Sequence, residues 1–189
     1  MKAPVANQRK GAPMDDQVEV APLSLDDPAW ADLLCRSGGG GWVPEWLRSL
    51  PAHPDTFTEE WPELSSEGTT WPAGIAAFPH LVQIAESLRA GSRLEYAVVL
   101  GLIVADWEPD SMPGPPLPEA IDTAYRAAFP PALRLVAEES AFPLSNERDV
   151  RYVLMALAAL QGVPELASCI DELDEEDTCP RYAAHIWGS

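Results

Sequence analysis

The sequence is poor in basic residues, in cysteine and in long apolar runs, and each scarcity excludes a class of protein. Its 189 residues hold 12 Lys and Arg against 30 Asp and Glu, which gives a formal net charge of −18. Binding to nucleic acid or to an anionic membrane requires a basic surface that neutralises phosphate, so neither is expected as a partner. No apolar run approaches the roughly 18 to 20 residues that span a bilayer, and the N-terminal segment lacks the apolar core of a signal peptide. We therefore expect a cytoplasmic protein.

The residues that usually carry catalysis or bind metal form no recognisable pattern. The three cysteines make no C-x-x-C pair, which favours reduced thiols over a disulfide framework, and no histidine has a second His or Cys at helical spacing. His80 is expected on the surface of a helix. Phosphate-binding loops, dinucleotide fingerprints and nucleophile elbows are absent, and acidic pairs such as Glu138-Glu139 are interpreted as solvated faces. We predict no metal, no cofactor and no enzymatic activity.

The composition predicts one all-α domain. A hydrophobic content of 47% over 189 residues is enough for one core. Residues 1–20 mix proline, glycine and charge without periodicity, so we expect a disordered or loosely attached arm followed by one helical-repeat domain over 21–189. Apolar residues recur at helical spacing, and only the tail TCPRYAAHIW is compatible with a short extended edge. After two short helices at Asp27-Pro28 and Pro44, longer ones are predicted at 72–90, 93–106, 118–141, 146–161 and 164–174.

A repeated tetrapeptide organises the helical part. AAFPHLVQIA begins at Ala76 and AAFPPALRLV begins at Ala127, and each is followed by an almost wholly apolar helix that contains a tyrosine. Proline inside a helix removes one hydrogen bond, so a kink is predicted at Pro79 and a kink or split at Pro130. Helical pairs of this kind bury their apolar faces by stacking on neighbours. We therefore predict a right-handed α-solenoid of HEAT-like helical hairpins with proline-kinked helices.

Three local predictions concern the first long helix and the connection before it. The glycine run at 37–41 is predicted to be a flexible joint, because no strand precedes it. Thr69 or Thr70 is predicted to cap the helix that starts at Pro72 through a side-chain oxygen. Gly91 is predicted to end the same helix.

Negative charge and tryptophan are concentrated in the connections. Residues 42–70 hold six acids against Arg48 alone, residues 106–122 hold five acids and no base, and residues 171–177 hold six acids. Two interpretations stay open for the charge, a surface that only keeps the protein soluble and a face that attracts a basic protein. The tryptophans either pack the helix ends or anchor an interface. The interface interpretation predicts a partner-binding site made of Trp61, Glu63, Glu67, Asp106, Trp107, Glu108 and Asp110.

The stretch LSSEGTTWPAGIAAFPHLVQIA, residues 64–85, resembles an H-Q-G-T-x-Y-x-A-S-x-A-A-x-P-H-L motif of bacterial helical-repeat proteins. Ser66 and Glu67 replace the His-Gln pair of the motif, and Tyr182 stands where the family's tail has the second cysteine of a C-P-x-C knuckle, so no zinc knuckle is expected. The resemblance covers residues 60–187 and implies a helical-repeat binding protein similar to the immunity partners of bacterial polymorphic toxins. The matching positions are Gly68, Thr69, Trp71, Ala73, Ala76, Ala77, Pro79, His80 and Leu81.

The charge, the tryptophans and the resemblance together predict a non-catalytic immunity protein. It would neutralise a cognate bacterial toxin, a basic protein, by covering the toxin's active site, and it would be a monomer before binding. Two alternatives stay open. One is a housekeeping α-solenoid scaffold, and the other is a small hydrolase whose site carries no recognisable motif.

Overall fold

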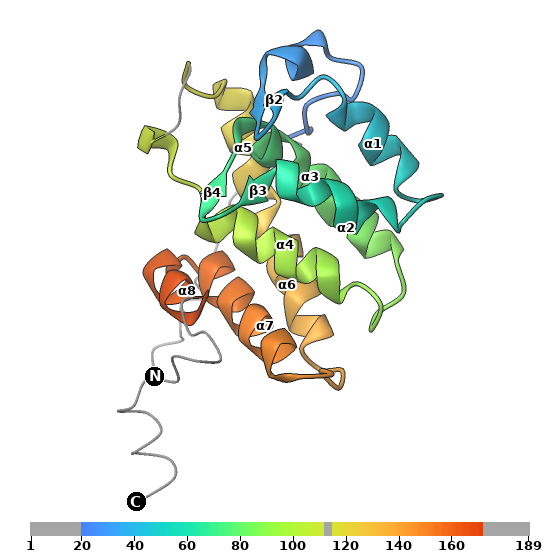
Figure 1. Cartoon of the computed structure of the whole chain (residues 1–189), viewed down its shortest axis with the longest axis vertical. Coiled ribbons are helices and arrows are strands. Elements are labelled where there is room, and N and C mark those ends of the chain that lie inside the picture. Colours follow the sequence, from blue (N-terminus) through green and yellow to red (C-terminus); the bar gives the residue numbers. More distant parts are fainter. Residues whose placement is uncertain (1–19, 112–114, 172–189) are drawn as a thin grey trace, which may run out of the picture.

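The computed structural model describes residues 20–111 and 115–171 and shows a mostly helical protein (Figure 1), as predicted. The predicted extended tail and all but the last residue of the predicted arm lie outside these ranges. The elements, in chain order, are η1 (Pro28–Asp32), β1 (Leu34–Cys35), β2 (Gly38–Gly39), α1 (Val43–Ser49), α2 (Thr56–Glu60), η2 (Trp61–Glu63), β3 (Ser65–Ser66), β4 (Thr69–Thr70), α3 (Pro72–Ser87), α4 (Leu94–Ala105), η3 (Pro109–Ser111), α5 (Glu119–Ala127), α6 (Phe129–Glu139), α7 (Glu147–Leu160) and α8 (Pro164–Asp171).

Two short antiparallel hairpins, absent from the sequence-based prediction, precede the long helices. β1 pairs with β2, and β3 pairs with β4. The prediction of a flexible glycine joint is therefore wrong, because the run forms one strand of the first hairpin and packs closely. A Cβ on Gly39 would lie 2.9 Å from the carbonyl oxygen of Ala31, and a Cβ on Gly40 would lie 3.0 Å from that of Leu33. Glycine is needed here because the backbone passes too near its neighbours for a side chain.

The hairpins belong to two similar structural units that lie 31 residues apart, from Trp30 to Trp61. In the first unit η1, the β1–β2 hairpin and α1 follow one another, and in the second unit η2, the β3–β4 hairpin and α3 do the same. Equivalent backbone N–H groups donate to equivalent carbonyls in both units: Leu33 to Trp30 and Gly40 to Leu33 in the first, Leu64 to Trp61 and Trp71 to Leu64 in the second. The chain thus contains a repeated unit, but its repeat is the hairpin and not the AAFP segment.

The two AAFP segments occupy different positions in their helices. Pro79 lies inside α3, which continues to Ser87, whereas Pro130 lies in the first turn of α6, after α5 has ended at Ala127. The predicted split at Pro130 is confirmed, but a shared role for the two segments is wrong. Proline in a first turn costs no helical hydrogen bond, so the second segment marks a helix start.

α3 and α4 lie at the centre of the core. Every residue from 72 to 79 is buried, and in α4 only Glu95 is exposed. Figure 1 shows α4 between α3 and α7, and it packs against both. At its contact with α7, a Cβ on Gly101 would lie 2.3 Å from the Cβ of Ala156. The almost wholly apolar helix predicted at 93–106 is therefore present as α4, and all of its residues except Glu95 are buried or partly buried.

The ends of α3 differ from the prediction. Trp71 is the N-cap residue and makes no side-chain capping bond, so the predicted threonine cap is wrong. Thr70 is instead buried in β4, where its hydroxyl lies 2.9 Å from the hydroxyl of Ser65. Gly91 has a φ of 83°, as a turn glycine does, but α3 has already ended at Ser87.

Candidate functional site

Three of the predicted partner-binding residues lie in the second hairpin unit, and two of them bind the first hairpin. The carboxylate of Glu63 accepts a hydrogen bond from the backbone N–H of Ser37 at 2.9 Å, and Glu67 pairs with Arg36 at 3.0 Å. Trp61 is partly buried against the core. Glu67 stays largely exposed, at 79% of its side chain. These two acids therefore join the hairpins, and Glu67 also adds negative charge to the surface.

The other four predicted residues follow α4 and lie beside the second hairpin. The backbone N–H of Thr70 donates to the carbonyl of Asp106 at 3.1 Å, which joins β4 to the end of α4. Trp107 is partly buried against the core, whereas Glu108 and Asp110 are exposed. The structure thus brings the acidic connection after α4 next to the second hairpin, although the two segments are far apart in the sequence.

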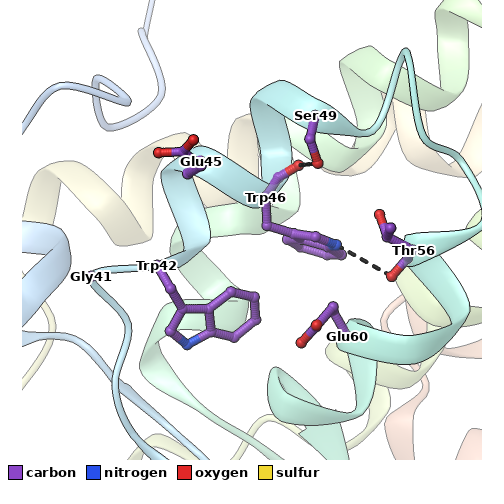
Figure 2. Close-up of a pocket in the computed structure, with 7 residues that line it drawn as sticks. All are labelled: Gly41, Trp42, Glu45, Trp46, Ser49, Thr56 and Glu60. Carbon is purple, nitrogen blue, oxygen red and sulfur yellow. Dashed lines mark hydrogen bonds between the residues drawn. The ribbon is translucent and has the colours of Figure 1, made fainter.

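A pocket of about 460 Å³ lies between α1 and α2 (Figure 2). Small-molecule sites typically enclose about 300–1,000 Å³, so the pocket is large enough for an amino-acid side chain. Its walls include Trp42, Glu45, Trp46, Thr56 and Glu60. Figure 2 shows the Glu60 side chain extending from α2 toward the indole of Trp42. The pocket therefore combines aromatic surface with carboxylates.

One wall of the pocket is the end of a series of aromatic rings that leads into the core. The ring centroids of Trp42 and Trp46 are 5.8 Å apart, those of Trp46 and Phe57 are 6.1 Å apart, and those of Phe57 and Tyr96 are 3.9 Å apart. The indole N–H of Trp46 donates to the carbonyl of Thr56 at 3.4 Å. Burial raises the pKa of Tyr96 to about 12, so this phenol is neutral at physiological pH. These contacts hold Trp46 in place, and the pocket is therefore largely preformed.

The charge of the pocket is negative. Within the part of the chain that the structure describes, no hydrogen bond or ion pair engages the carboxylates of Glu45 and Glu60. The single basic residue of α1, Arg48, pairs with Asp26 outside the pocket. Both pocket carboxylates are therefore available to a cation from outside.

This pocket was not predicted from the sequence, although part of its signal is visible there. Trp42, Glu45 and Trp46 have the i, i+3, i+4 spacing that places three side chains on one face of a helix. Glu60 stood out less, because it is one of many acidic residues in its segment. The sequence could not show that α2 packs alongside α1, and this tertiary contact is what closes the pocket.

A second charged cluster ties the turn between α3 and α4 to α6. The carboxylate of Glu139 accepts hydrogen bonds from the backbone N–H of Gly91 at 2.9 Å and from the guanidinium of Arg93 at 2.7 Å, and Arg93 also pairs with Glu138. Glu139 is only 2% exposed. Burial lowers the pKa of Arg93, but the bonds to both carboxylates outweigh burial and leave the pKa raised. This cluster is internal and structural, so the prediction that Glu138-Glu139 is simply a solvated face is wrong for Glu139.

His80 is partly buried, which corrects the prediction of a plain surface residue. Its Nε2–H donates to the carbonyl of Leu23 at 2.9 Å, and its ring lies 6.1 Å from that of Trp30. Burial lowers the pKa of His80, and the bond to Leu23 opposes this only in part.

Within residues 20–111 and 115–171, no group of three or more His, Cys, Asp or Glu could hold a metal ion. Over the same ranges, no helix has the length and apolar character to cross a membrane.

Comparisons of the chain with protein-family models, with curated proteins and with solved structures gave no match. The features of the molecule that bear on its function are the pocket, the acidic connections and the residues that position them.

Proposed function

We propose that this chain is a non-catalytic binding protein for a basic protein, and that it acts as an immunity protein that covers the active site of a cognate bacterial toxin. The observation that carries the proposal is a preformed aromatic pocket in a stretch with a clear excess of acid. Residues 42–70 hold six acids and one arginine, and that arginine is paired with Asp26. Such a surface attracts a cationic partner and repels an anionic one.

The pairing of arginines with acids of the same chain supports the same proposal. Most of the arginines described in the structure are already bound to carboxylates of the chain itself, so little positive charge is left to repel a basic partner. The carboxylates that remain give the surface its excess of negative charge, which steers a basic partner and speeds its approach. The paired arginines are Arg36, Arg48, Arg93, Arg126 and Arg134.

The proposal includes several features that follow from the sequence. The protein would lie in the cytoplasm and remain a monomer until it binds. The helical pairs would stack in a right-handed, HEAT-like manner, as the resemblance to bacterial helical-repeat proteins implies. The predicted site would then act as one surface, with Trp61 and Trp107 as apolar contacts and Glu108 and Asp110 at the rim.

Affinity capture from the source bacterium tests the proposal. The full chain is immobilised and the lysate is applied at low salt, and proteins that elute with rising salt are identified. The expected result is a basic protein that the chain inhibits when both are purified. Failure to retain any basic protein, or a retained protein whose activity the chain leaves unchanged, would contradict the proposed function.

A further inference from the structure

We infer that the pocket between α1 and α2 binds an arginine side chain of the partner protein, with the guanidinium over the Trp42 indole and bonded to Glu60. This inference rests on the proposed function, because it names the group by which a basic protein would be recognised. It goes further, since it moves the centre of recognition to a pocket that lies outside the seven residues predicted from the sequence.

The geometry suits a flat cation. Trp42 and Trp46 are tilted by 59° at a centroid distance of 5.8 Å, and the Trp46 ring also stacks with Phe57. The negative face of an indole attracts a cation, and Trp is the strongest aromatic partner for this contact. Glu60 extends toward the Trp42 ring in Figure 2. A cation over Trp42 would therefore meet a carboxylate without rearrangement of the backbone.

The second hairpin unit provides an internal comparison. Shifting α1 by the 31 residues that relate the two units places Trp42, Glu45 and Trp46 at Ala73, Ala76 and Ala77 of α3. Those alanines are 0%, 2% and 0% exposed and belong to the core. In the first unit the equivalent Trp46 is also buried in the core, but Trp42 is partly exposed and Glu45 is exposed where they border the pocket. Packing alone does not require this difference.

Arginine fits the pocket better than lysine does. A guanidinium is planar, so it can stack on an indole and still donate two parallel N–H groups to one carboxylate. An ammonium is a strongly hydrated point charge and gains less from a flat aromatic surface. Glu45 also lines the pocket and adds a second negative charge near the bound cation.

Nuclear magnetic resonance of the full chain tests the inference with N-acetyl-arginine amide as the probe. The indole N–H signals of Trp42 and Trp46 are followed during titration, and the Trp42 signal is assigned by its loss in Trp42→Phe. The neutral isostere N-acetyl-citrulline amide and the lysine analogue are titrated in parallel. We expect a saturable shift with the arginine probe, a weaker one with the lysine probe and none with the citrulline probe.

Variants locate the binding. Glu60→Gln and Trp42→Leu should each raise the dissociation constant of the arginine probe at least fivefold, whereas the matched control Glu59→Gln, on the same helix but outside the pocket, should change it less than twofold. Glu60→Gln is isosteric on a partly exposed residue, so it tests the inference even if Trp42→Leu does not fold. An unsaturable shift, equal response to citrulline, tighter binding of lysine, or no effect of Glu60→Gln would each overturn the inference.

The two proposals fail in distinguishable ways. If Glu60→Gln abolishes binding of the arginine probe but a captured basic partner binds wild type and variant equally, the pocket is not the recognition site while the proposed function stands. If the arginine probe binds in the pocket but no basic partner is inhibited, the proposed function is wrong.

Discussion

Glu139 and Arg93 carry opposite charges that are almost fully buried, with exposures of 2% and 6%. A buried ion pair adds little over an apolar pair of the same shape, but removing one partner leaves an uncompensated charge in the core. Glu139 also accepts from the backbone N–H of Gly91, where the chain turns between α3 and α4. The residue therefore fixes the path of this turn as well as balancing the charge of Arg93.

Glu139→Gln should lower the free energy of unfolding by up to about 3–5 kcal/mol, because only the half-exposed Glu138 would remain to compensate the buried charge of Arg93. Glu138→Gln is the matched control. It removes the other carboxylate of the cluster, but that side chain is 49% exposed, so the expected loss is only about 0–1 kcal/mol. Urea unfolding followed by circular dichroism measures both. Equal losses for the two variants would show that burial of Glu139 does not set its importance.

His80 should make the stability depend on pH in the mildly acidic range. Its pKa is lowered in the folded protein, so between this value and the unfolded value of about 6.5 the unfolded chain binds more protons. The free energy of unfolding should therefore be fully maintained above pH 6.5 and fall as the pH decreases toward the folded pKa. His80→Gln should reduce this dependence.

The exposed His53 provides the control for that measurement. Urea unfolding at pH 7.5, 6.5 and 5.5 is compared for wild type, His80→Gln and His53→Gln. We expect the slope between pH 6.5 and 5.5 to decrease only in the His80 variant. A stability that rises on acidification in wild type but not in His80→Gln would contradict the direction of the pKa shift.

At the scale of elements, local chemistry predicted some starts and ends well. Asp27 accepts a hydrogen bond from the backbone N–H of Ala29 with Pro28 between them, as the Asp-Pro sequence predicted. The helix predicted at 146–161 is α7 (Glu147–Leu160), so the prediction is within one residue at each end. These features depend on neighbours in the sequence, which is why the sequence alone could predict them.

The hairpins could not be predicted in the same way. Their strands have two residues each, too few for an alternating pattern. The glycines of the first hairpin are needed because Ala31 and Leu33 pass close by, which is a tertiary contact. The pocket could not be predicted for the same reason. The spacing of its α1 residues is visible in the sequence, but its closure by α2 depends on tertiary structure.

The contact between α4 and α7 should be sensitive to one methyl group. Gly101→Ala would place a Cβ 2.3 Å from the Cβ and 2.5 Å from the Cα of Ala156, so the helices must move apart. We expect a loss of about 1–3 kcal/mol in the free energy of unfolding. Gly41→Ala is the control, because its Cβ would have ordinary contacts of 3.6 and 3.7 Å with Ala31. A neutral Gly101→Ala in thermal and urea unfolding would show that this interface is looser than the structure indicates.

We propose that the negative charge of the protein serves recognition of a partner and not only solubility. The excess is local, with six acids and one arginine over residues 42–70 and no base over residues 106–122. Charges at the rim of an interface act mainly on the association rate, whereas buried aromatic contacts slow dissociation. The two roles can therefore be separated by kinetics.

The decisive experiment measures the association rate of the captured partner as a function of ionic strength, for wild type and for Glu108→Lys/Asp110→Lys. The control Glu95→Lys/Glu147→Lys changes the net charge equally, at exposed positions near the N-terminal ends of α4 and α7. At physiological salt, interactions between exposed charges are largely screened beyond a Debye length of about 8 Å. We expect wild type and control to associate about tenfold more slowly at high than at low salt, and the Glu108/Asp110 variant to lose most of this dependence while keeping its helical fold. An association rate that changes neither with salt nor with the Glu108/Asp110 charge reversal would contradict this proposal. The acidic connections would then have no part in recognition.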